Sequence, residues 1–286
     1  MMKELLTTAC LVAALPLCAQ WPDYPTSKTP HDADGKAKLD APTPRTADGK
    51  PDLSGIWEYR GPMIPGAGQR AGQQGAPPRT PPPPPPLPAD GIPLATFRNI
   101  GAGFKDGLPL RPAATELLRA RKAENSKDNP DAHCLPLGLM QLHTHPQPRK
   151  IIQSPDVTVI LYEAQAGIRQ IFTDGRKLPP ADAQPWWYGY SIGHWDGDTM
   201  VVETTGFRDD VWLDIDGTPL TNKGKLTERF HRVNYGTLNI DVTVEDPTMY
   251  TAPFTVKVIQ RIMPDTELIE FICQENDRSG PHLVGK

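Results

Sequence analysis

The amino-acid sequence predicts a mainly β fold, in which an antiparallel meander forms a closed or nearly closed barrel with one helix outside it. The second half of the chain contains short apolar segments rich in Val, Ile, Thr, Tyr and Phe, which are typical of strands. Tight turns join these segments, so strands adjacent in sequence are expected to pair antiparallel. Helical segments do not alternate with them, which excludes a parallel doubly wound sheet. A meander of this length must close or leave exposed edges, so we expect closure.

Nine strands are expected. The first is the alternating segment 52–59, which contains Trp57. Hairpin connectors such as Asp196-Gly197 and residues 234–236 separate several of the others. The remaining eight predicted strands are residues 157–163, 168–173, 188–195, 199–207, 225–233, 237–244, 254–262 and 267–274.

One helix is predicted over residues 112–122, because apolar positions recur at helical spacing and Pro112 stands first, where a missing N–H is harmless. Residues 20–50 are polar and proline-spaced, which predicts an extended segment. Residues 51–286 are then a single β domain. It contains a proline- and glycine-rich insertion, residues 61–94, which we expect to be a solvated loop with a polyproline run.

The N-terminus predicts the compartment. Lys3, an apolar run over residues 5–17 and the small residue Ala19 form the pattern of a secretory signal peptide, residues 1–19. The run is too short to span a bilayer, and no later segment approaches that length, so we expect no membrane span. The sequence therefore predicts that the protein is secreted or periplasmic. The alternative is a lipoprotein acylated at Cys18, although the bulky Leu17 does not suit the position before that cysteine.

Two cysteines remain after the signal peptide, Cys134 and Cys273. In an oxidising compartment this number predicts one disulfide. A catalytic thiol is the alternative, with His133 as its base, but neighbours on an extended chain point to opposite faces.

The composition argues against several classes of function. With 30 basic and 34 acidic residues and a net charge of −4, nothing favours a nucleic acid or an anionic membrane as partner. The sequence has no phosphate-binding glycine loop and no dinucleotide fingerprint. We therefore expect no cofactor. The sequence leaves the oligomeric state open.

The predicted hairpin at Asp196-Gly197 provides the first candidate site. A two-residue loop there places Tyr190 opposite Glu203 and separates two faces of the hairpin. If the first face lines the barrel, it forms a pocket with one acid; if it points outward, Tyr190 and Glu203 form an ordinary cross-strand pair. The first face carries Tyr188, Tyr190, Ile192, His194, Val201 and Glu203, and the second carries Gly189, Ser191, Gly193, Trp195, Met200, Val202 and Thr204.

A second hairpin, through Gly167, places Tyr162 opposite Arg169. If Arg169 is buried on that apolar face it requires a carboxylate partner, for which Glu203 is a candidate. The alternative is a surface arginine that lies along Tyr162. The candidate ligand-binding residues are thus Trp57, Tyr162, Arg169, Tyr188, Tyr190 and Glu203.

Metal binding is not expected. His133, His143 and His145 would suit a zinc with an open position, but their spacing matches no familiar zinc motif and Pro146 indicates a loop. Residues 214–217 open like a calcium loop but lack its later acidic ligands, so a turn between strands is the better interpretation.

Five motifs are similar to those of a large group of uncharacterised secreted bacterial proteins, and the likeness extends from Pro51 to Lys286 outside the insertion. This resemblance implies no particular activity. Gly55-Ile56-Trp57 on a first strand also resembles the G-x-W opening of lipocalin-type barrels, in which the tryptophan closes one end. The five motifs are residues 51–57, 134–136, 169–176, 193–199 and 204–207.

These observations predict a protein that binds a small, partly apolar molecule. The first alternative is a hydrolase or lyase that uses Glu203 with Tyr190 or His194 as acid and base. The second is a carbohydrate-binding or interaction module whose Trp186-Trp187 pair docks on a sugar or a partner.

Overall fold

The computed structural model describes residues 26, 28–61, 88–273 and 275 of the chain. The predicted signal peptide, Cys18 and residues 62–87 of the proline-rich insertion lie outside this part. Within it, no helix has both the length and the apolar character needed to cross a bilayer.

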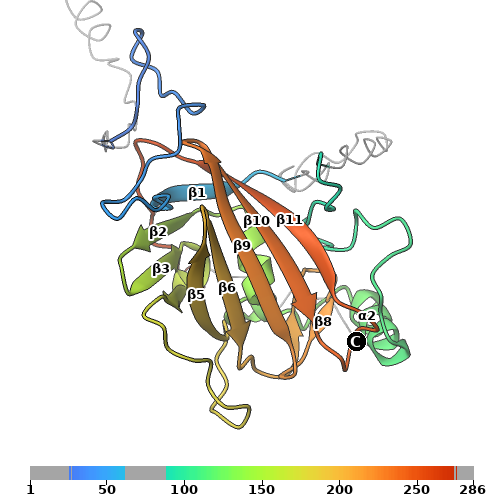
Figure 1. Cartoon of the computed structure of the whole chain (residues 1–286). Coiled ribbons are helices and arrows are strands. Elements are labelled where there is room, and N and C mark those ends of the chain that lie inside the picture. The colour runs from blue at the N-terminus through green and yellow to red at the C-terminus, as the bar shows by residue number, and fades with distance from the viewer. Residues whose placement is uncertain (1–25, 27, 62–87, 274, 276–286) are drawn as a thin grey trace, which may run out of the picture.

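Nine strands form a closed barrel in the order β1-β11-β10-β9-β6-β5-β4-β3-β2 (Figure 1). The predicted mainly β fold and its closure are therefore confirmed. The barrel strands are β1 (Gly55–Tyr59), β2 (Arg149–Gln153), β3 (Val157–Tyr162), β4 (Ile168–Phe172), β5 (Tyr190–Asp196), β6 (Thr199–Thr205), β9 (Lys225–Asn234), β10 (Thr237–Glu245) and β11 (Phe254–Ile262), while β7 (Val211–Trp212) and β8 (Pro219–Leu220) form a separate pair.

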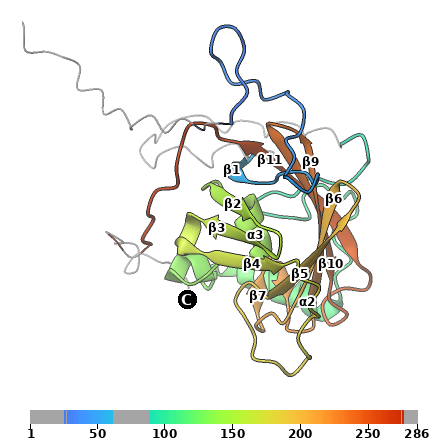
Figure 2. The same ribbon diagram turned by 60° about the vertical axis from the view of Figure 1, so that its left-hand side comes forward.

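The barrel departs from a simple meander at one junction. β4 and β5 are parallel neighbours, with Ile171 opposite Ser191, whereas every other pair in the barrel is antiparallel. The long connection between them, residues 173–189, lets the chain return before β5 begins. In Figure 2 this connection is the yellow loop at the bottom of the barrel.

Two differences from the predicted strands concern closure. β2 was not predicted, yet it pairs with both β1 and β3. Residues 267–274 were predicted as a strand, but the described residues of this segment are not in the sheet. The reason is that β11 already pairs with β1, so no sheet edge remains for a further strand. The chain after β11 instead descends past β2 and β3 (Figure 2); residues 263–273 are here called the strap.

Two α-helices occur in the described residues. α2 (Pro112–Ala123) lies outside the barrel, close to the predicted bounds. α3 (Leu139–Thr144) was not predicted; all six of its residues are buried, and Figure 2 shows it within the ring of strands. A short apolar helix thus fills space in the barrel, because an interior of this width must be packed.

The interior face is mostly apolar. Strict alternation along β9 and β10 buries every second side chain, as in the pattern of Leu238, Ile240, Val242 and Val244. Burial of such side chains supplies the main stabilisation of the fold, at about 25 cal/mol per Å². Trp57 belongs to this core: it is fully buried and its indole N–H donates to the carbonyl of Leu53 at 3.0 Å.

Candidate functional site

The β5–β6 hairpin presents its Glu203 face to the outside of the barrel. Met200 and Val202 are buried in the core, whereas Glu203 is partly exposed and forms an ion pair with Lys225. The outward alternative therefore holds, and the pocket expected around Glu203 does not form in the interior. His194 is exposed on the same outer face.

The predicted turn of this hairpin was displaced by one residue along the chain, which shifts the pairing of the two strands by two residues. The loop consists of Gly197 and Asp198, so that Asp196 lies opposite Thr199 and Tyr190 lies opposite Thr205. A type II′ turn needs a positive φ only at its first central residue, and Gly197 provides it with φ of +59°. Because the shift is two residues in total, the membership of the two faces is unchanged.

Tyr190 joins an aromatic surface outside the barrel. Its ring stacks on Phe172 with centroids 5.3 Å apart and contacts Trp186 at 5.2 Å. The guanidinium of Arg176 lies over Phe172 and donates to the Tyr190 hydroxyl at 3.1 Å. Trp187 lies under Arg208, 4.4 Å from it. These contacts leave Trp186 exposed.

Arg169, in contrast, is fully buried inside the barrel and has the carboxylate partner that burial requires. The partner is Glu228 on β9 and not Glu203: one guanidinium nitrogen donates to Glu228 at 2.9 Å and a second forms an ion pair with its other oxygen. Arg169 also donates to the hydroxyls of Ser191 and Thr204, at 3.0–3.1 Å. The register of its hairpin is also shifted, since Arg169 lies opposite Ile160 and not Tyr162.

His143 of α3 completes this arrangement. Its Nε2 lies 2.6 Å from Glu228, and both side chains are essentially inaccessible to solvent. Burial lowers the pKa of His143 although Glu228 opposes the shift. Burial alone would raise the pKa of Glu228, but Arg169 and His143 hold it below its usual range. The site therefore pairs the Glu228 carboxylate with the Arg169 guanidinium, and the His143 imidazole lies against the same carboxylate.

Arg149 is a second buried arginine, and it has no carboxylate partner in the described structure. Its guanidinium donates to the backbone carbonyls of His143, His145 and Gln147 and to the side chain of Gln260, all at 2.7–2.8 Å. Burial lowers its pKa to about 10. The group formed by His143, Arg149, Arg169 and Glu228 is here called the interior polar cluster. Arg149 anchors α3 and the following loop in the barrel.

The three histidines considered for zinc have different surroundings. His143 contacts Glu228, His145 packs edge-on against Phe97 with centroids 4.9 Å apart, and His133 lies near the Lys127 carbonyl on the surface. Within the described residues, no group of three or more potential ligands converges. Asp214 is buried and accepts from Thr218 and backbone amides, which makes it the centre of a turn, as expected.

A cavity of about 250 Å³ lies outside the wall, between the β3–β4 hairpin and the strap. Ile168 is 62 % exposed on the hairpin, and Ile272 is 53 % exposed on the strap. Tyr162, whose ring lies 6.3 Å from that of Tyr188, also lines it and is almost fully buried. We call it the strap cavity; its lining is residues 161–163, 166–168 and 268–272.

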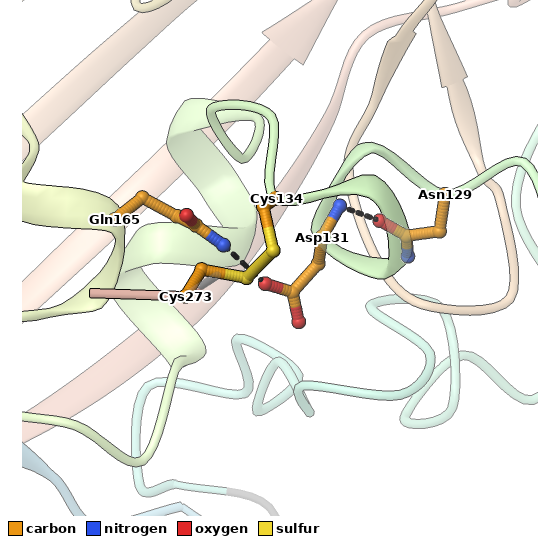
Figure 3. Close-up of a disulfide and its surroundings, with 5 residues drawn as sticks. All are labelled: Asn129, Asp131, Cys134, Gln165 and Cys273. Carbon is orange, nitrogen blue, oxygen red and sulfur yellow. Dashed lines mark hydrogen bonds between the residues drawn. A yellow bond between two sulfur atoms is a disulfide. The ribbon is translucent and has the colours of Figure 1, made fainter. Parts of the chain in front are cut away.

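The part of the strap that lines the cavity is fastened by an ion pair, a hydrogen bond and a disulfide. Lys150 of β2 pairs with Glu267 at 2.7 Å, and the backbone N–H of Ile269 donates to Glu163 at 3.2 Å. The Cys134–Cys273 disulfide, as predicted, ties its far end to the loop before α3 (Figure 3). The disulfide thus holds the five strap residues of the cavity against the barrel wall.

The sequence analysis missed Glu228, Arg149, Glu163 and the role of the strap. A signal for Glu228 exists: on the strand 225–233 it alternates with Leu226 and Phe230, which places a carboxylate on an apolar face. The apolar strap carried the composition of a strand and gave no sign of its different role.

Neither the scan against family models nor the searches of curated proteins and solved structures found a match.

Proposed function

We propose that this chain is an extracytoplasmic β-barrel protein that binds a small, partly apolar molecule in the strap cavity. The predicted signal peptide and the disulfide support the compartment. The observation that carries the binding function is the concave site itself, where exposed apolar side chains surround a few polar groups. Ligand sites have this composition, and contiguous exposed apolar side chains mark interaction surfaces.

The apolar character of the site comes from both of its walls. Ile168 projects from the hairpin, and Ile269, Phe271 and Ile272 belong to the strap; all four are more than a third exposed. A ligand that covers them removes apolar surface from water, which favours binding at about 25 cal/mol per Å². The size of the cavity suits a small molecule or one end of a longer chain.

The test uses N-phenyl-1-naphthylamine, a neutral apolar fluorophore, titrated into the oxidised protein. We expect saturable binding that Ile168→Asp weakens by about tenfold or more, because a carboxylate then faces the apolar wall. Ile152→Asp is the matched control, since Ile152 is also an exposed isoleucine, 45 % accessible, on a barrel strand but outside the cavity. Absence of saturable binding, or equal loss in both variants, would overturn the proposal.

A second candidate function is carbohydrate binding on the outer aromatic surface. It is favoured by the adjoining rings of Phe172, Tyr190 and Trp186, next to the hydrogen-bonding groups of Arg176. Trp186→Ala should then reduce retention of the protein in affinity electrophoresis through soluble polysaccharides, without a change in N-phenyl-1-naphthylamine binding. Unaltered retention of the variant in every polysaccharide tried would count against this function.

A further inference from the structure

We propose that the ligand of the strap cavity carries a positive charge on its apolar body, as an aliphatic amine does. This inference rests on the proposed function and names the class of ligand. It follows from the charges on the cavity wall, from the partners of those charges, and from the ring beside them.

The charged side chains that line the cavity are both acidic. They are Glu163, at the end of the β3–β4 hairpin, and Glu270, on the strap; the other lining residues are uncharged. The two acidic residues come from the two segments that enclose the cavity, the hairpin and the strap. Their combined field favours a cation and disfavours an anion.

Neither carboxylate is neutralised by a basic side chain of the described structure. Glu163 is only 8 % exposed, yet its donors are the backbone N–H of Ile269 at 3.2 Å and the side-chain amide of Gln147 at 3.5 Å, which are both uncharged. For Glu270, the described residues supply no ion-pair partner. Nearby Glu267, on the same strap, does have one in Lys150.

Burial makes the charge of Glu163 decisive for selectivity. A neutral ligand that covers the cavity would remove water from this carboxylate and offer nothing in return, which costs free energy. An ammonium group offers charge-assisted hydrogen bonds, which are about twice as strong as neutral ones. The ring of Phe271, 38 % exposed in the same wall, supplies a face for the cation.

Two buried arginines, Arg169 and Arg149, do not line the cavity. Arg169 is compensated by Glu228, and Arg149 is engaged by three backbone carbonyls and Gln260 inside the barrel. Burial raises the pKa of Tyr162, and the positive charges of Arg169 and Arg149 oppose this shift. The charged end of the ligand is therefore expected on the Glu163 and Glu270 side, away from Tyr162.

The experiment measures displacement of N-phenyl-1-naphthylamine by three ligands of equal chain length: decylamine, decanol and decanoate, below their aggregation limits. We expect decylamine to bind about tenfold tighter than decanol, with decanoate weakest. Glu270→Gln and Glu163→Gln should each shrink the advantage of the amine while leaving decanol unchanged. The glutamine at 163 can still accept the Ile269 N–H, so the strap keeps this fastening.

Glu267→Gln is the control, because Glu267 lies on the strap but is paired with Lys150 and does not line the cavity. It should retain the full preference for the amine. Equal binding of decylamine and decanol would overturn this inference and leave the proposed function standing. If none of the three ligands displaces the fluorophore and the fluorophore itself does not bind, the proposed function fails. A preference for the amine that survives both Glu163→Gln and Glu270→Gln would also overturn the assignment.

Discussion

The interior polar cluster and the strap cavity differ in whether their carboxylates have a cationic partner. Inside the barrel, Arg169 and Glu228 are inaccessible, and each has the other as its partner. At the cavity, Glu163 and Glu270 lack a cationic partner within the described structure, and apolar side chains beside them are exposed. A buried ion pair whose two charges compensate each other supports the fold. A surface hollow with open charges and exposed apolar groups is suited to a ligand.

The disulfide belongs to the cavity side of this comparison, and its loss gives the largest expected effect. For the 139-residue separation of Cys134 and Cys273, the chain-entropy model gives about 5 kcal/mol of stabilisation. Reduction, or Cys134→Ser with Cys273→Ser, should lower the melting temperature by calorimetry and weaken fluorophore binding. The oxidised protein kept in the same buffer without reductant is the control. Unchanged binding after reduction would show that the strap stays in place without its covalent tie.

Breaking the interior pair should cost nearly as much without touching the cavity directly. Glu228→Leu leaves the Arg169 guanidinium buried and unpaired, and such changes cost about 3–5 kcal/mol. Arg169→Met combined with Glu228→Leu should recover a large part of this loss, because no lone charge then remains. Urea denaturation of the single and double variants measures both effects. A double variant that is no more stable than Glu228→Leu would show that the pair contributes more than mutual compensation.

The two faces of β6 provide a third contrast. Met200 is buried at 1 % exposure, so Met200→Ala should cost about 2–5 kcal/mol through the lost contacts and the remaining cavity. Glu203→Ala should cost about 1 kcal/mol or less, because it breaks only a partly exposed pair with Lys225. Equilibrium unfolding of both variants tests this difference, and equal costs would contradict the assignment of the two faces.

Local patterns in the sequence were sufficient for the barrel, the external helix and the disulfide. Alternation along β9 and β10 and the tight turns between strands specify which residues share a face, and the faces were correct although the turn at Gly197 was displaced. A carboxylate partner for Arg169 was expected only for the case in which this side chain is buried, with a surface arginine as the alternative. The identity of that carboxylate could not be predicted, because Glu228 reaches Arg169 only across the closed interior.

The strap and β2 could not be predicted for a different reason. Both depend on which edges meet when the barrel closes, and this is decided by pairing between β1 and β11, about 200 residues apart in the chain. Residues 267–274 have strand composition, yet no edge is left for them. The strap cavity exists only because that segment is excluded from the sheet, so its site residues could not be inferred from local periodicity.

The last expected effect on stability depends on pH and comes from His145, beside the cluster. Burial, assisted by the charge of Arg149, lowers the pKa of His145 to about 4 from an ordinary 6.5. Above pH 6.5 the imidazole is neutral in both states and contributes no pH dependence. As the pH falls from 6.5 to 4, the unfolded chain binds a proton that the folded protein does not, so the free energy of unfolding decreases by up to about 3 kcal/mol.

His145→Asn isolates this contribution, because an asparagine oxygen can replace Nδ1 as acceptor for the backbone N–H of Gln147, which lies 3.2 Å away. His143 also has a lowered pKa in the folded state and loses stability on the same side of neutrality, so wild type and variant share that background. The difference between their urea-unfolding curves from pH 7 to pH 4 reports His145 alone. We expect the variant to lose less stability than the wild type over this range. Parallel curves would mean that the imidazole takes up its proton in the folded protein as readily as in the unfolded chain, and that its place against Phe97 does not exclude water.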